Sequence, residues 1–221
     1  MSCHEVRLQG FVVDILREDE VYEIQSRRFY VLRHKLSKLL ETHKVTVVYP
    51  VVRQKWIIWV DEESGQVVRR RKSPKMGRAC HILAELYGIR DLLAHENLSF
   101  AVVSLDAEEY RRAPRRTSGE KTGSAEAHVC KGRSHKGQDR LECIPLVWHD
   151  MTCFGGTRER GLERVLPEFP ELAGEFTSLE FGRAARLPRH EDVHKAMKVL
   201  SAADVIRCVG KQGRRCVYRK A

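Results

Sequence analysis

The stretch GFVVDILREDEVYEIQ, residues 10–25, constrains the fold more than any other part of this 221-residue chain. Two short apolar runs, Phe11–Leu16 and Val21–Ile24, flank an acidic turn, and this pattern is typical of a β-hairpin. Alternation along the strands places Asp14 among apolar neighbours and puts Glu23 on the facing strand. Carboxylates in such a position are costly unless they are paired, hydrogen-bonded or bound to a metal. We therefore expect the carboxylates of Asp14 and Glu23 each to have such a partner.

Periodicity in residues 26–105 alternates between helical and strand spacing. Apolar residues recur at helical spacing across Ser26–His43, which predicts an amphipathic helix with Ser26 as its N-cap. The elements expected next are a buried strand at Val45–Val52, a hairpin of Trp56–Val60 with Gln66–Arg69, a basic loop at Arg69–Arg78, a helix at Arg78–Tyr87 and a strand at Leu98–Leu105. This order predicts an α/β domain over residues 1–106, with a mixed sheet covered by helices.

Residues 107–138 are dominated by Arg, Lys, Ser, Gly and Glu, which predicts a basic flexible linker. The segment 139–175 has no clear period. Within it Leu141–Trp148 fits a helix or a strand, and Pro145 interrupts either one.

The last part of the chain has a clearer pattern. Helices are expected over Ser178–Ala185, with Thr177 as cap, and over Arg189–Ala203. A hairpin of Val205–Gly210 with Arg214–Arg219 follows them. Helix, turn, helix and two-stranded wing is the order of a winged helix-turn-helix, so a second domain is expected over residues 139–221, with its core at 176–221.

Composition and charge narrow the class of partner. The net charge of +10 favours a polyanion, and residues 183–221 carry eleven Lys or Arg against three acidic residues. Double-stranded DNA is therefore the expected partner. An apolar fraction of 42% supports a real core, whereas no apolar run approaches the roughly 18–20 residues that span a bilayer, so no membrane association is expected.

The cysteines and the N-terminus point to a cytoplasmic location. Seven cysteines are scattered without a C-x-x-C pair, and the first residues lack the apolar stretch of a signal peptide. An odd count without a secretion signal favours reduced thiols. The sequence leaves the oligomeric state open, a homodimer included.

Asp14, eight intervening residues and then Glu23-x-Gln25 resemble the PD-(D/E)XK, or restriction-endonuclease-like, nuclease superfamily. The resemblance covers residues 10–105 and implies that Asp14 and Glu23 hold Mg²⁺ or Mn²⁺ while Gln25 orients water. Hard divalent cations prefer carboxylate oxygens, and metal-bound water can attack phosphorus. Lys35, on the flank of the expected helix, is the candidate for offsetting phosphate charge.

Two departures from the superfamily pattern bear on catalysis. Gln25 replaces the usual lysine, although some restriction enzymes of the superfamily carry glutamine at this position. The superfamily also begins with a helix before the first strand, and only about ten residues precede Phe11, so either this chain starts late or that helix is missing.

The chain is more closely similar to a group of uncharacterised bacterial and archaeal proteins with a C-terminal winged helix. The shared features are the phrase around Glu23–Gln25, the Val48–Pro50 strand, Lys55–Trp56, the Arg70–Arg78 loop and the GKQGRRCVYRK ending. This resemblance spans most of the chain and implies no particular activity.

The candidate DNA contacts lie in three basic segments: Arg70, Arg71, Lys72 and Lys75 in the loop; His190, His194, Lys195 and Lys198 on the second C-terminal helix; and Lys211, Arg214 and Arg215 at the wing. The loop fits a solvated charge run equally well, and a winged helix can also bind protein.

Two further readings concern zinc and aromatic residues. His128, Cys130 and His135, and likewise Cys143, His149 and Cys153, are ligand types without the paired spacing of structural zinc. Tyr30, Trp56 and Trp59 are interpreted as core or sheet-face aromatics rather than base-stacking platforms.

Three functions remain open on the sequence. The first is a DNA-binding, Mg²⁺-dependent endonuclease that carries out phosphodiester hydrolysis. The second is a DNA-binding or regulatory protein on a catalytically degenerate nuclease scaffold. An RNA-binding factor ranks last because RNA-binding aromatic signatures are lacking.

Overall fold

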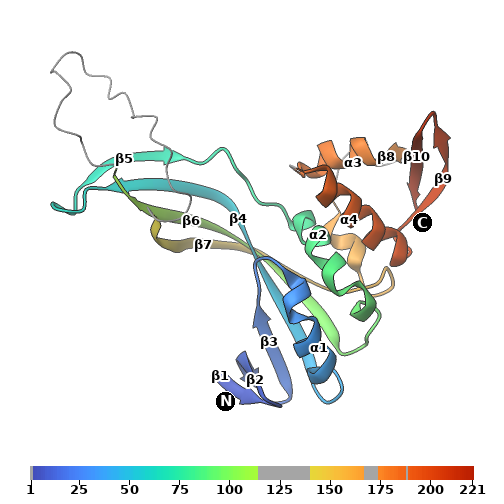
Figure 1. Ribbon diagram of the computed structural model, residues 1–221, viewed down its shortest axis with the longest axis horizontal. Coiled ribbons are helices and arrows are strands. Elements are labelled where there is room, and N and C mark those ends of the chain that lie inside the picture. Colours follow the sequence, from blue (N-terminus) through green and yellow to red (C-terminus); the bar gives the residue numbers. More distant parts are fainter. Residues whose placement is uncertain (1, 114–139, 167–173, 188) are drawn as a thin grey trace. The chain divides into compact units, whose positions relative to one another are not determined.

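The computed structural model describes residues 2–113, 140–166, 174–187 and 189–221, and it is a mixed α/β structure as expected (Figure 1). Strands paired in the order β1-β2-β3-β4-β6-β7, with β5 on β4, form a large mixed sheet, and β8-β10-β9 form a small one. The strands are β1 Ser2–Leu8, β2 Phe11–Arg17, β3 Glu20–Ile24, β4 Lys44–Val60, β5 Val67–Lys72, β6 Leu98–Arg112, β7 Arg140–Gly155, β8 Phe176–Thr177, β9 Ile206–Gln212 and β10 Arg215–Lys220.

Helices are short in the described residues. The α-helices are α1 Arg33–Leu39, α2 Ile82–Leu86, α3 Ser178–Ala185 and α4 His190–Ala202, and the 3-10 turns are η1 Phe29–Leu32, η2 Ala79–His81, η3 Tyr87–Leu92 and η4 Leu162–Val165. None of the helices in these segments is both long and apolar enough to cross a membrane.

The chain divides into two compact units. The first contains residues 1–51, 77–105 and 149–221, and the second contains residues 52–76 and 106–148, so β4, β6 and β7 contribute to both. This grouping differs from the expected division at residues 106 and 139, because α4 packs against α2 and both ends of the chain share one core. The expected linker is also shorter at its start, since residues 107–112 belong to β6.

The predicted hairpin is present as β2 and β3, paired antiparallel with Ile15 opposite Tyr22 and Leu16 opposite Val21. β1, which the sequence analysis did not anticipate, pairs antiparallel with β2. β3 then runs parallel to the start of β4. The antiparallel strands β1, β2 and β3 and the parallel start of β4 therefore form one continuous part of the sheet. A helical connection leads from β3 to β4.

β4 is a single long strand rather than the separate strands predicted at 45–52 and 56–60. Its ladder with β3 ends where the Gln25 N–H donates to the Val48 carbonyl, 2.9 Å away. In a parallel pair every second residue faces the neighbouring strand, so the next N–H on this side belongs to position 50. Pro50 has no N–H, and the strand continues past the point where β3 stops.

The helix expected over Ser26–His43 is wrong at its start. Arg28 has φ 59°, a left-handed conformation that cannot continue an α-helix, and its N–H donates to the Glu85 carboxylate at 2.6 Å. Ser26 is therefore not a cap, and helical structure begins at Phe29. The predicted apolar stripe is nevertheless buried: Phe29, Leu32, Leu36, Leu39 and Leu40.

The basic loop predicted at Arg69–Arg78 is partly a strand, because residues up to Lys72 pair with β4 as β5. Register places Arg69 opposite Trp59 and Arg71 opposite Ile57. The hairpin with its turn after Asp61 is confirmed, and β7 resolves the ambiguity at 141–148 in favour of a strand. Because β7 ends the strand order, it is an edge strand, where a proline such as Pro145 is tolerated.

The two C-terminal helices and the hairpin are confirmed as α3, α4 and β9–β10 (Figure 1). Thr177 caps α3 in a capping box with Glu180. β8, which the sequence analysis missed, pairs with β10. α2 joins this group as well, since it packs against α4, and the ring nitrogen of His81 in the preceding turn η2 lies 3.0 Å from the Ala185 carbonyl oxygen at the end of α3.

Candidate functional site

Asp14 and Glu23 face each other across the β2–β3 hairpin. The register that places Ile15 opposite Tyr22 puts these two carboxylates at the adjacent facing positions. Asp14 Oδ2 accepts a hydrogen bond of 2.7 Å from the Ile24 N–H. One of its oxygens is therefore committed to the backbone of the strand that carries Glu23.

Lys35 brings a positive charge to this pair. Its ammonium lies 2.5 Å from Glu23 Oε1 and also donates to the Val12 carbonyl. Only 4% of Glu23 is exposed, and Oε1 has no hydrogen-bond donor other than this ammonium among the described residues. Burial raises the pKa of Glu23 despite the opposing effect of Lys35.

The four residues predicted to act in catalysis are only partly brought together. Asp14, Glu23 and Lys35 converge, whereas the Gln25 side chain donates to the Arg27 carbonyl. Two carboxylates would supply a divalent cation with few ligands, and Mg²⁺ would need water and substrate phosphate for the rest. Within the described segments, no group of three or more His, Cys, Asp or Glu side chains could hold a metal ion.

A shallow pocket of about 530 Å³ lies beside Asp14. Its lining comes from β1, β2 and β3: His4, Glu5, Asp14, Ile15 and Ile24. The contribution of β1 was missed because its sequence, SCHEVRL, has neither an apolar run nor strict alternation.

The predicted loop contacts all belong to the second unit. Arg70 lies over the Trp56 ring, 4.2 Å from its centroid, and its guanidinium is 3.0 Å from Glu108. Arg71 lies 5.3 Å from the Trp59 centroid. Lys72 is exposed at the end of β5, and Lys75 follows in the loop. Trp56 and Trp59 are thus sheet-face aromatics, as interpreted, whereas the interpretation is wrong for Tyr30, which lies on η1 and is 59% exposed.

The predicted contacts on α4 occupy one stripe of the helix, where Lys195 is half-buried and the other three are exposed. The His190 and His194 rings stack with centroids 5.7 Å apart. Lys195 pairs with Glu191 at 2.5 Å, and Lys198 lies over the Tyr87 ring at 5.8 Å. All four side chains therefore also make contacts within the protein.

The wing carries its basic residues on the surface. Lys211 is the next-to-last residue of β9, Arg214 lies in the turn with Gly213, which has φ 62°, and Arg215 begins β10. All three side chains are exposed, in a hairpin whose β9 strand is exposed from its second residue onward.

The zinc candidates do not form a site in the described residues. His128, Cys130 and His135 lie outside them. Cys143, His149 and Cys153 are all on β7, and no metal-binding cluster includes them.

A mixed sheet joined to a helical group with a basic hairpin defines the structural class, and comparison with known sequences adds the family. Residues 1–139 match the family described as "Domain of unknown function (DUF8091)". That match covers more than half of the chain, which therefore belongs to this family. An "Uncharacterized protein" of Treponema pallidum (strain Nichols) is 40% identical over 108 residues, 48% of this chain and 43% of the relative. The matched part thus spans less than half of that relative's length. No solved structure matches the chain.

Proposed function

We propose that this protein binds double-stranded DNA through the segment formed by α3, α4 and the β9–β10 hairpin. The exposure of Lys211, Arg214 and Arg215 on the hairpin carries the proposal, because an exposed basic hairpin beside a helix can contact phosphates or the minor groove. The stripe of His190, His194, Lys195 and Lys198 on α4 lies on the helix that would enter the major groove.

The connectivity around this segment supports a winged helix. The small sheet has the order β8-β10-β9, so the strand before α3 pairs with the second strand of the hairpin. α2 packs against α4 and provides a third helix from a distant part of the sequence, and His81 of the preceding turn η2 contacts the end of α3. Three helices and a small sheet with a projecting hairpin fit the winged helix-turn-helix expectation.

Binding of a fluorescein-labelled DNA duplex, followed by fluorescence anisotropy, tests the proposal. Replacing Lys211, Arg214 and Arg215 together by alanine is expected to weaken duplex binding by at least about tenfold at low salt. A matched triple variant of exposed basic residues elsewhere in the first unit, Arg7, Arg17 and Lys38, controls for the loss of net charge. Equal losses in both triple variants would contradict the proposal.

The site at Asp14 and Glu23 on the β2–β3 hairpin favours a second candidate function, Mg²⁺-dependent DNA cleavage. The supporting observation is that Asp14, Glu23 and Lys35 lie close together. The order of the elements that carry them, three antiparallel strands followed by a helix and a parallel strand, also fits the nuclease resemblance. Asp14 and Glu23 would hold the cation, and Lys35 would offset phosphate charge. The Lys35 contact to Glu23 competes with the cation, so a degenerate scaffold is the alternative.

Nicking of supercoiled plasmid separates these alternatives. With Mg²⁺ or Mn²⁺ the parent should nick the plasmid and Asp14→Ala should not, if the site is active. Equal cleavage by Asp14→Ala and Glu23→Ala would reject the assignment. No nicking, with duplex affinity unchanged by Mg²⁺, would identify a DNA-binding protein on a degenerate scaffold.

A further inference from the structure

One face of the sheet in the second unit collects cations around a tryptophan. Trp59 of β4 lies opposite Arg69 in the β4–β5 register, and alternation brings Arg71 to the same face. The two guanidinium carbons lie 5.5 and 5.3 Å from the Trp59 ring centroid. Both arginines are exposed, so the half-buried indole and its two cations form a surface feature rather than part of the core.

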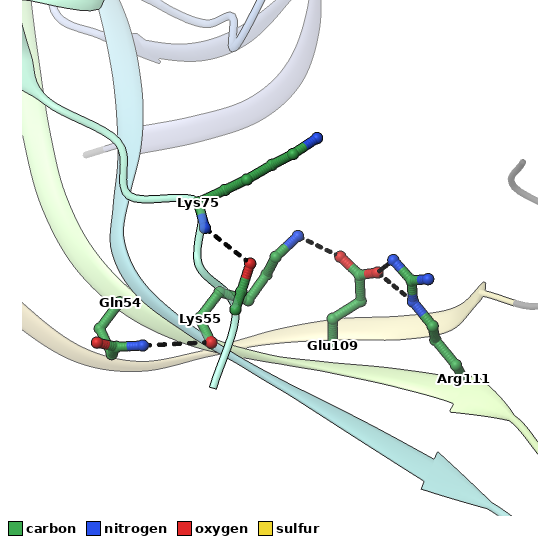
Figure 2. A network of polar contacts seen from close by, with 6 residues as sticks. Gln54, Lys55, Lys75, Glu109 and Arg111 are labelled. Atoms are coloured by element: carbon green, nitrogen blue, oxygen red, sulfur yellow. Dashed lines mark hydrogen bonds and ion pairs between the residues drawn. The ribbon is translucent and has the colours of Figure 1, made fainter. Parts of the chain in front are cut away.

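A second pair of cations lies on the same face and is held in place by a buried carboxylate. Lys55 Nζ is 2.5 Å from Glu109 Oε2, and Arg111 is 2.5 Å from Glu109 Oε1 (Figure 2). Only 4% of Glu109 is exposed. Burial alone would raise its pKa, but hydrogen bonds from Lys55 and Arg111 lower it below the ordinary value. Glu109 is therefore a fixed anion that orients two partly exposed cations.

These residues define the Trp59 face: Lys55, Trp59, Arg69, Arg71, Glu109 and Arg111. Four cations against one carboxylate leave a strong positive excess beside an aromatic ring. The opposite face is more nearly balanced, because Arg70 there lies over Trp56 and pairs with Glu108, which also accepts from Tyr110. The two faces of one sheet thus offer a matched pair of tryptophans in different electrostatic surroundings.

We propose that the Trp59 face binds an unpaired polynucleotide strand, with Trp59 stacking on a base while Lys55, Arg69, Arg71 and Arg111 contact the phosphates. Positive charge that follows the backbone, together with an aromatic platform for the bases, is the combination that single-stranded nucleic acids require. The planar guanidinium groups of arginine also stack on tryptophan. Trp59 is a sheet-face residue in this proposal too, but it now has the base-stacking role that the sequence interpretation had set aside.

This inference does not rest on duplex binding by the C-terminal segment, because the residues belong to the other unit. The two ideas therefore fail separately. The Lys211, Arg214 and Arg215 triple variant should lose duplex affinity and keep strand affinity. Changes on the Trp59 face should do the reverse.

The test measures anisotropy of labelled oligo-thymidylate and oligo-uridylate with the full-length chain. Trp59→Leu is expected to weaken binding of the preferred strand by about tenfold or more, and Trp59→Phe by less, since a smaller ring still stacks. Trp56→Leu on the opposite face is the matched control and should leave affinity within about twofold. Thermal unfolding of each variant, followed by circular dichroism, shows whether it is folded.

A second readout is independent of affinity. Stacking of a base on Trp59 should quench its fluorescence, so oligonucleotide addition should quench the Trp56→Leu variant but not the Trp59→Leu variant. Binding of oligo-thymidylate or oligo-uridylate with this pattern of quenching supports the inference. The oligonucleotide that binds more tightly shows whether the preferred ligand is DNA or RNA. Equal losses from both tryptophan variants, or loss only in the C-terminal triple variant, would overturn it.

Discussion

The ammonium of Lys35 on α1 lies 2.5 Å from Oε1 of Glu23 on β3, and both side chains are largely buried, at 14% and 5% exposure. This contact joins the hairpin to the helix that follows it. The buried pair also explains how a carboxylate can occupy a central strand at all, since a buried charge needs a partner.

Replacing Lys35 by methionine should be strongly destabilising, because it leaves the Glu23 carboxylate buried without its cation. The expected loss in the free energy of unfolding is about 3–5 kcal/mol, measured by urea denaturation. The double variant Glu23→Gln, Lys35→Met should recover much of this loss. Lys38→Met is the control, since Lys38 is 55% exposed and its pair with Glu41 at 3.5 Å is worth roughly 0–1 kcal/mol. Equal costs for the Lys35 and Lys38 variants would contradict the ion-pair account.

His81 predicts a pH dependence of stability. Burial lowers its pKa, so between the lowered value and the ordinary one the unfolded chain binds more protons than the folded protein. Stability contributed by neutral His81 is therefore present above a pH of about 6.5 and is lost as the pH falls below it. His81→Gln should flatten this part of the profile. Urea midpoints across this range provide the measurement, and parallel profiles for the parent and His81→Gln would refute the assignment.

The stability of the fold should depend on the planar shape of the Arg160 guanidinium. It donates to the carbonyl oxygens of His95, Glu96 and Leu98 at 2.6, 2.9 and 2.8 Å, and so holds the turn before β6. Arg160→Lys keeps the charge but loses the planar fork, and should cost about 2 kcal/mol or more. The same change at exposed Arg158 should cost little. A thermal midpoint of Arg160→Lys equal to that of Arg158→Lys would show that the fork is not needed.

Much of the fold could be predicted because its strongest patterns are local. The β2–β3 hairpin, the apolar stripe of residues 29–40 and the α3–α4–β9–β10 order follow from periodicity, caps and turns. The approach of Asp14 and Glu23 could also be expected from strand alternation, whereas Lys35 was a candidate only through the resemblance to the nuclease superfamily.

What could not be predicted depends on contacts distant in sequence. The late start of the expected helix follows from Arg28, whose left-handed backbone is tied to Glu85 far along the chain. α2 joins α3 and α4 only through tertiary packing, as in the His81 contact to Ala185. The cations on the Trp59 face meet because β6 lies beside β4 and supplies Glu109, and no local pattern signals this.

The salt dependence of duplex binding tests the central proposal most directly. The measurement is the association constant for a labelled DNA duplex over a series of salt concentrations, for the parent and the Lys211, Arg214 and Arg215 triple-alanine variant. Each lost phosphate contact should reduce the slope of log K against log salt by roughly 0.9, so a drop of about 2–3 is predicted. An unchanged slope, or a parent that does not bind the duplex, would contradict the account.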